Sequence, residues 1–182
     1  MKIPEPDITT DRLQIRRLEL TDTRAIYDIF SDKEVTRFWS SEVFTELEQA
    51  REFIRQTHEG FEDLRLLEWG IELKEGGKLI GTCAYSSWHR KHRRAEIGAA
   101  IHRDYWNKGI MTELMPPFLE YGFNNLNLHR IEADVDPENK PAIHLLEKFG
   151  FQREGRLRER FLFDGKYQDS VIYSLLEDEV KF

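Results

Sequence analysis

The stretch Ala95–Glu113, AEIGAAIHRDYWNKGIMTE, carries the strongest structural signal in the chain. It joins a strand to a helix through a tight turn at Asn107-Lys108-Gly109. The first backbone N–H groups of a helix have no partner within it, and the helix dipole is positive at that end. The predicted helix start after Gly109 therefore suits a phosphate or a pyrophosphate.

Side chains alternate along a strand, so every second residue of the strand before this turn shares one face. That face carries Arg94, Glu96, Gly98, Ala100 and His102. It places one carboxylate beside two very small residues, which leave room for a ligand on which the carboxylate could act. An anion-binding turn next to a lone acid indicates transfer of a group from a nucleotide-like cofactor.

Apolar periodicity and turn residues divide the rest of the chain into strands and helices. Thr21 is expected to cap one helix, and Thr45-Glu46-Leu47-Glu48 is typical of a capping box that opens a second helix. A closing hairpin is expected to turn at Asp164-Gly165. Strand-like patterns begin at 13 and cover about 66–73, 78–87 and 130–135, with a further helix near 139–149. The pattern predicts a mixed α/β sheet in a single domain, residues 1–182.

Two prolines, Pro116 and Pro117, fall near the third turn of the helix after Gly109. A proline inside a helix removes a hydrogen bond and clashes with the preceding turn, at a cost of about 3 kcal/mol. The sequence therefore predicts either a kink or a helix that restarts near Pro116.

Length and composition fit one globular domain with a substantial core, since the 182 residues are 40% hydrophobic and 12% aromatic. No apolar run is long enough to span a membrane, and the first residues lack the apolar core of a signal peptide. We therefore expect a soluble cytoplasmic protein without a membrane partner. The net charge of −7 argues against general nucleic-acid binding and is compatible with a cationic substrate such as an amine.

The single cysteine, Cys83, excludes an internal disulfide and lies in an apolar run typical of a buried structural thiol. The basic run 89–94 is interpreted as a solvated hairpin turn, with contact to RNA or to an acidic partner as the alternative. His89 and His92 have no further ligands at a suitable spacing, so no metal site is predicted.

Three successive segments resemble the GNAT superfamily of acetyltransferases. They read AEIGAAIHRDYWNKGIMTE, LHRIEADVDPENKPAIHLLEKFGF and EGRLRERFLFDGKYQDSVIYSLL. The likeness covers nearly the whole chain and is greatest to the RimJ/RimL-type branch, the ribosomal-protein N-terminal acetyltransferases. It implies a single-domain GNAT fold, with a mixed, mostly antiparallel central sheet that is flanked by helices and splayed between its fourth and fifth strands.

The resemblance implies that the chain binds acetyl-CoA and transfers its acetyl group directly to a primary amine. The family's pyrophosphate loop, Gln/Arg-x-x-Gly-x-Gly/Ala, falls here on Trp106-Asn107-Lys108-Gly109-Ile110-Met111, followed by Thr112. Gly109 matches this pattern, whereas Asn107 and Met111 depart from its usual small residues. Asn tolerates left-handed backbone geometry, and the Met111 side chain could point away from the main-chain donors. The other cofactor contacts that the resemblance implies are Ile101, His102 and Arg103 beside the pantetheine arm, and Asn139.

Glu96 is the candidate general base, acting through a water on the acceptor ammonium. The alternative is a structural carboxylate that pairs with Arg94 or Arg130. The resemblance places a backbone N–H near Ile101 as the donor to the thioester oxygen. Many family members carry a Ser as general acid where this chain has Ala142, so the acid is unassigned, and a thiolate can leave without one.

Three aromatic residues, Phe38, Trp39 and Phe44, lie between the first two helices, where the family covers its acceptor site. Packing in the core is the alternative for all three. Nearer the C-terminus, His144 is expected on a helix surface, and Asp169 is expected to be structural.

The leading hypothesis is an acetyl-CoA-dependent amine N-acetyltransferase. A protein N-terminus, as on a ribosomal protein, is the first acceptor considered, and a small amine such as a polyamine, amino sugar or antibiotic is the second. A non-catalytic acetyl-CoA-binding sensor or regulatory module is the alternative, favoured by Ala142 and Met111. Homodimers are common in the family, but the sequence identifies no dimer surface.

Overall fold

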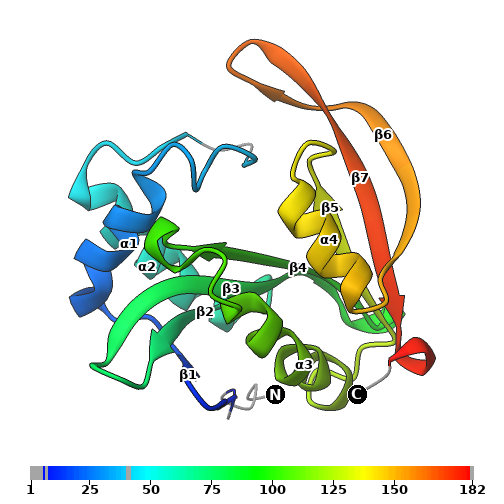
Figure 1. The fold of residues 1–182 in the computed structure, drawn as a ribbon, viewed down its shortest axis with the longest axis horizontal. Coiled ribbons are helices and arrows are strands. Elements are labelled where there is room, and N and C mark those ends of the chain that lie inside the picture. The colour runs from blue at the N-terminus through cyan, green and yellow to red at the C-terminus, as the bar shows by residue number, and fades with distance from the viewer. Residues whose placement is uncertain (1–5, 7, 40–41, 181–182) are drawn as a thin grey trace.

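The structure, a computed structural model, describes residues 6, 8–39 and 42–180. The described chain folds into a seven-stranded sheet in the order β1-β2-β3-β4-β5-β7-β6, with helices on both faces (Figure 1). The strands are β1 (Leu13–Arg16), β2 (Leu66–Leu73), β3 (Lys78–His89), β4 (Arg94–Ile101), β5 (Arg130–Val135), β6 (Gln152–Phe163) and β7 (Lys166–Leu176). The α-helices are α1 (Thr23–Phe30), α2 (Leu47–Asp63), α3 (Ile110–Asn124) and α4 (Lys140–Lys148). Among these helices none is long and apolar enough to span a membrane.

All neighbouring strands run antiparallel except β4 and β5, which are parallel. The parallel pairing is short, because it joins only Arg94–Glu96 to Arg130–Glu132. Past Glu96 the two strands separate, so β1–β4 and β5–β7 form two arms of one sheet (Figure 1). This geometry confirms the expected mixed sheet that is splayed between its fourth and fifth strands.

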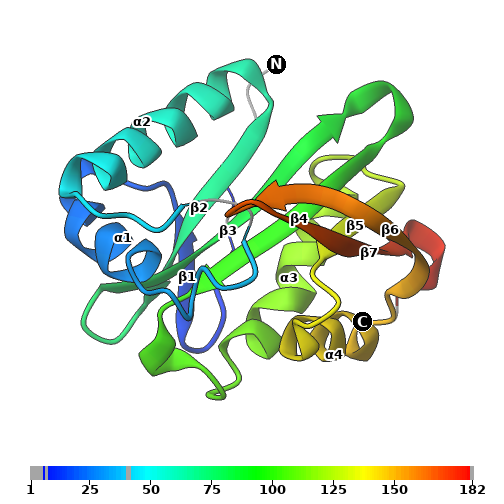
Figure 2. The same cartoon turned by 90° about the horizontal axis from the view of Figure 1, so that it is seen from above.

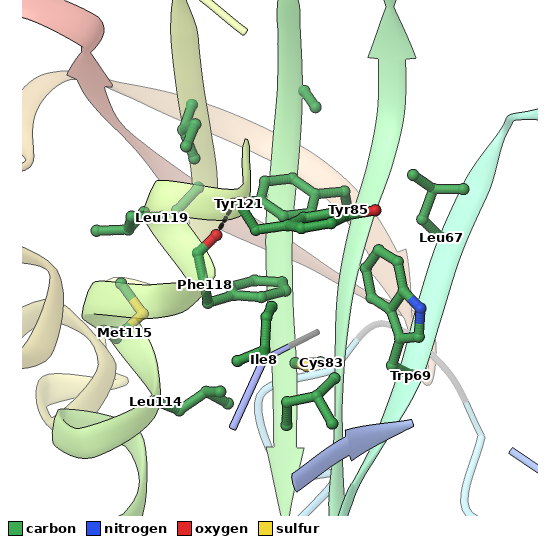
Figure 3. Packing of buried hydrophobic residues seen from close by; sticks show 14 of the residues in the cluster. Ile8, Leu67, Trp69, Cys83, Tyr85, Leu114, Met115, Phe118, Leu119 and Tyr121 are labelled. Atoms are coloured by element: carbon green, nitrogen blue, oxygen red, sulfur yellow. Dashed lines mark hydrogen bonds between the residues drawn. The ribbon is translucent and has the colours of Figure 1, made fainter. Parts of the chain in front are cut away.

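The larger core lies between the sheet and α3 (Figure 3). Trp69 and Tyr85 of β2 and β3 point to this side, where the Tyr85 ring stacks on Phe118 of α3 at 4.5 Å between ring centroids. The Tyr85 hydroxyl also donates a hydrogen bond of 2.7 Å to the Phe118 carbonyl. Cys83 is fully buried in the same core, and burial raises the pKa of its thiol, which confirms a structural cysteine.

A second core fills the opposite face of the sheet, beneath α1 and α2 (Figure 2). Phe30 of α1 is its centre, with ring centroids of Phe44 and Phe53 at 5.3 Å and 4.9 Å. Aromatic pairs at such distances add to the hydrophobic gain of burial. These contacts fix α1 and α2 over β2 and β3.

The α1 start differs from the expected cap at Thr21. A 3-10 turn spans Leu20–Asp22, and α1 begins at Thr23 with Asp22 at its N-cap position. The carboxylate of Asp22 accepts the backbone N–H of Glu19 at 2.8 Å, so the turn is stabilised by an acidic side chain instead of by Thr21.

The capping box of α2 is displaced by one residue from the expected one. Glu46 is extended and precedes the helix, and the Gln49 side chain accepts the backbone N–H groups of Thr45 and Glu46 at 2.7 Å and 2.9 Å. Glu48, the expected partner in the box, instead pairs with Arg51 at 2.8 Å. The extended backbone at Glu46 decides at which residue the capping box begins. The sequence pattern alone does not reveal this backbone conformation.

α3 continues through Pro116 and Pro117 as one helix, so of the two expected alternatives, a kink or a restart near Pro116, the restart is wrong. The prolines leave the carbonyls of Thr112 and Glu113 without their usual N–H donors. Leu114 and its apolar neighbours in α3 are buried on the core side. Their packing outweighs the lost hydrogen bonds.

The basic run 89–94 connects β3 to β4, as the hairpin interpretation predicted. A 3-10 turn spans Arg90–His92 and is exposed, with the rings of His89 and His92 4.3 Å apart. Arg93 is structural, since its guanidinium donates to the Asn127 carbonyl at 2.9 Å. Within the described ranges, no three His, Cys, Asp or Glu side chains are grouped so that they could hold a metal ion.

Candidate functional site

The turn between β4 and α3 has the geometry that its sequence predicted. Asn107 and Gly109 adopt left-handed φ angles of 58° and 75°, and Gly109 is the N-cap of α3. The Trp106 indole donates a hydrogen bond of 2.8 Å to the Ile101 carbonyl, which ties the turn to the end of β4. The first N–H groups of α3 therefore open beside the end of β4, where they suit an anion.

Met111, the large residue in this turn, contacts the core. Its side chain is partly buried and packs against the core beneath α3. Whether the main-chain donors of the turn bind a pyrophosphate beside Met111 stays a prediction.

An arginine from the N-terminal part of the chain fixes the turn from outside. Arg12 donates through Nη1 to the Lys108 carbonyl at 3.0 Å and through Nε to the Glu113 carboxylate at 2.6 Å. Thr10 also donates to Glu113, at 2.5 Å. Burial would raise the pKa of Glu113, but the hydrogen bonds from Thr10 and Arg12 hold it below its usual range. Sequence reasoning missed this contact because about a hundred residues separate its partners.

Backbone groups of β4 are open where β5 departs. His102 donates its N–H to the Ile80 carbonyl of β3 at 2.8 Å. Because successive residues of a strand point their N–H groups to opposite sides, the N–H of Ile101 points away from β3. The same holds for Ala99, two residues earlier. Since pairing with β5 ends at Glu96, these N–H groups face the gap between the strands and can pair with an extended ligand.

Glu96 lies on β4 at the point where the strands separate, and its carboxyl is half-buried. Burial raises its pKa above the usual range, and the carboxylates of Asp134 and Glu132 raise it further. The Ser87 hydroxyl and Arg160 oppose the shift in part. A carboxyl of this kind is a better proton acceptor near neutral pH than an ordinary surface glutamate.

The arginines beside Glu96 bind other carboxylates. Arg94 donates to Glu132 at 2.9 Å, and Arg130 donates to Glu132 at 2.6 Å and to Glu154 at 2.5 Å and 2.8 Å. The alternative interpretation of Glu96 as their ion-pair partner is therefore not supported. Among the described acids where β4 and β5 separate, this network leaves Glu96 without an arginine ion pair.

Open space lies next to Glu96. Gly98 is exposed, and a Cβ atom built there would have no heavy atom within 4 Å. Ala100 is buried under α1 and α2. β4 ends at Ile101, and the ring of the next residue, His102, accepts the Asp104 N–H at 3.2 Å.

The three aromatic candidates differ in their surroundings. Trp39 and Phe44 pack on Phe30, with centroid distances of 5.4 Å and 5.3 Å, so both belong to the core under α1 and α2. Phe38 is half-buried and lies under the guanidinium of Arg37. Contact between these rings and an acceptor stays a prediction.

The start of α4 is built by Asn139, whose side-chain oxygen accepts the N–H of Ala142 at 3.2 Å. Ala142 itself packs against the main core and offers no proton. His144 is exposed on the helix surface, as expected. Asp169 binds Arg156 at 2.5 Å, which agrees with the expected structural role.

A second buried carboxyl, Glu68 of β2, escaped the sequence reasoning. The Glu68 side of β2 faces α1 and α2, where the residue is buried. Burial raises the pKa of Glu68 to about 7, and the nearby Thr82 hydroxyl opposes this rise in part. No ion pair with Glu68 forms among residues 6, 8–39 and 42–180. The available signal was a charged residue in the middle of the otherwise apolar segment 66–71.

Comparison with known proteins places this geometry in a family. Residues 12–152 match the family model described as "Acetyltransferase (GNAT) domain". The chain belongs to the GNAT acetyltransferase family. "Uncharacterized N-acetyltransferase p20" from Bacillus licheniformis is 38% identical, over 93% of this chain and 96% of its own length.

Two solved structures extend the comparison. The spermidine N-acetyltransferase from Vibrio cholerae in complex with CoA and spermine is 30% identical, with a TM-score of 0.81 over 92% of this chain and 96% of its own. RimJ from Mycobacterium smegmatis in complex with CoA-disulfide is 24% identical, with a TM-score of 0.84 over 93% and 84%, and this likeness shows the fold alone. Enzymes of the GNAT family use acetyl-CoA, and this chain is an N-acetyltransferase of that family.

Proposed function

We propose that this enzyme acetylates the primary amine of a small molecule. The observation that carries the proposal is Glu96, a half-buried carboxyl with no arginine partner, beside the open space at Gly98 and the gap between β4 and β5. The relative named as a spermidine acetyltransferase, at 30% identity, supports a small amine. A protein N-terminus, the first acceptor implied by the sequence, is supported by RimJ through its fold only.

The residues at the turn fit acetyl-CoA. The left-handed turn at Asn107 and Gly109 and the N-terminus of α3 would hold the pyrophosphate through backbone N–H groups. The open backbone of Ile101 would pair with the amide-containing pantetheine arm, with His102 and Arg103 next to it in the chain. When bound, acetyl-CoA supplies the thioester whose acetyl group is transferred.

Glu96 would take a proton from the acceptor, because an ammonium has no lone pair with which to attack. In this role it acts as general base through a water. The N–H of Ile101 would donate to the oxygen on which negative charge develops. Since Ala142 cannot donate a proton, the thiolate would leave without a general acid from that position.

Calorimetry with acetyl-CoA and a thiol-release assay over a broad amine panel test this proposal together. We expect binding of acetyl-CoA and release of CoA with small amines. Release with peptide N-termini alone would move the acceptor to a protein. Tight binding without release over the whole panel would favour the non-catalytic sensor, and absence of binding would contradict both functions.

Arg12→Gln should weaken CoA binding by about tenfold, because Glu113 in the first turn of α3 would then repel the pyrophosphate unopposed. The measurement is calorimetric titration with CoA. Arg24→Gln is the matched control, since Arg24 forms an exposed pair with Asp28 on α1. Pantetheine, which has no phosphate, should bind Arg12→Gln and the wild type alike. An unchanged affinity for CoA in Arg12→Gln would show that the contacts of Arg12 with Lys108 and Glu113 have no part in CoA binding.

A further inference from the structure

Three residues, Glu68, Ala84 and Gly98, form a row across the sheet on the face to which Glu96 points. The strand register places Glu68 opposite Ala84 and Ala84 opposite Gly98. Residues directly opposite one another in neighbouring strands point to the same face. The row covers two strand spacings, about 10 Å between its terminal Cα atoms. Glu96 stands two residues from Gly98 and shares this face.

Exposure rises along this row from β2 to β4. Glu68 is 6% exposed, Ala84 is 9% exposed, and Gly98 is exposed with free space above it. Glycine and alanine leave no bulky side chain between the two ends of the row. The face is therefore open at β4, beside Glu96, and closed around the carboxyl of Glu68, beneath α2.

Glu68 is a buried acid without a counter-ion among the described residues, and its neighbour Thr82 is a buried hydroxyl without a well-formed hydrogen bond. Glu68 forms no ion pair with any described residue, and burial raises its pKa to about 7. The Thr82 hydroxyl lies beside it, fully buried, but forms no hydrogen bond of normal geometry. Buried polar groups without partners cost free energy, which a ligand that satisfies them would restore.

We propose that Glu68 and Thr82 form a second cation-binding subsite, which selects acceptors that carry another ammonium group. An ammonium has three N–H donors and no acceptor, so it matches a carboxylate and a hydroxyl oxygen. The reacting amine would lie near Glu96, the methylene chain over Ala84, and the distal ammonium at Glu68. This inference rests on the proposed function and narrows its acceptor to linear diamines and longer polyamines.

The test compares linear diamines, from diaminopropane to diaminooctane, with monoamines of the same length. At the preferred length the wild type should favour the diamine in kcat/KM by at least about tenfold, the factor expected for one charge-assisted hydrogen bond. Glu68→Gln should remove most of this preference through KM and leave kcat and monoamine kinetics unchanged. Thr82→Val should remove part of it.

Glu72→Gln is the matched control, because Glu72 lies on the same strand and face but is bound by Arg16 at 2.6 Å. It should keep the diamine preference. A wild type that treats both amine classes alike, or a Glu68→Gln variant that keeps the preference, overturns the subsite and leaves amine acetylation intact.

A binding experiment separates failure of the subsite from failure of the proposed function. If no amine is acetylated, the proposed function fails. Calorimetry of diaminohexane and diaminobutane with the CoA-saturated protein still tests whether Glu68 binds an ammonium group. Binding that is about tenfold weaker in Glu68→Gln supports the subsite. Equal binding by both proteins, or no binding to the wild type, overturns it.

Discussion

Glu96→Gln is expected to lower kcat for amine acetylation by about a hundredfold or more, the usual loss when a general base is removed. Glutamine keeps the shape of the side chain but cannot accept the proton. The pKa of Glu96 is raised above the usual range for a glutamate. The wild-type rate should therefore rise with pH as Glu96 loses its proton, and this rise should occur at a higher pH than for an ordinary glutamate. Glu96→Gln should lack this rise.

Initial rates of thiol release from about pH 6 to pH 9 measure both effects of this substitution. Glu120→Gln, on the exposed side of α3, makes the same change in net charge away from the site and should behave as wild type. Affinity for acetyl-CoA should be unaffected in both variants. Unchanged turnover of Glu96→Gln over the whole range would remove Glu96 from the mechanism.

Glu68 should make the stability of the protein depend on pH. Burial raises its pKa from the ordinary 4.5 to about 7, so between these values the folded protein keeps a proton that the unfolded chain has released. The free energy of unfolding should therefore fall as pH rises through this window and level off above it. The expected size of the fall is up to about 3 kcal/mol.

Urea unfolding of Glu68→Gln at a series of pH values measures this dependence. The variant should lack the fall and, at about pH 8, should be more stable than the wild type by up to about 3 kcal/mol. Asp22→Asn provides a contrast of opposite sign, since Asp22 is a buried carboxylate held by Arg16 at 2.8 Å, and its loss should destabilise the protein. A wild type and Glu68→Gln with parallel stability curves would show that Glu68 is not buried as a neutral acid.

The strands and the turn before α3 could be predicted from sequence because they depend on local signals. Alternation of apolar residues gave β2 with the bounds Leu66–Leu73, and Asn107 and Gly109 marked the left-handed turn. Helix caps were predicted less well. Thr21 and Thr45 are good caps by residue type, but the extended backbone at Glu46 places the cap elsewhere.

The surroundings of the candidate base depend on residues distant in the chain. Sequence alone allowed Glu96 to pair with Arg94 or Arg130, because both are basic and nearby in the predicted sheet. Glu132 on β5 and Glu154 on β6 bind these arginines instead. Only the packing of three strands decides which carboxylate stays without a partner, so residue spacing could name Glu96 but not its environment.

The short pairing between β4 and β5 leaves the sheet open between these strands past Glu96. The turn before α3 leads into that helix on one face of the sheet, whereas Glu96 shares its strand face with Ala100, on the side that carries α1 and α2 (Figure 2). If acetyl-CoA binds at this turn and the amine beside Glu96, as proposed, the two reactants would arrive from opposite sides and neither would block the entry of the other. Such a two-sided arrangement favours a sequential ternary complex, in which no acyl group needs to be stored on the protein.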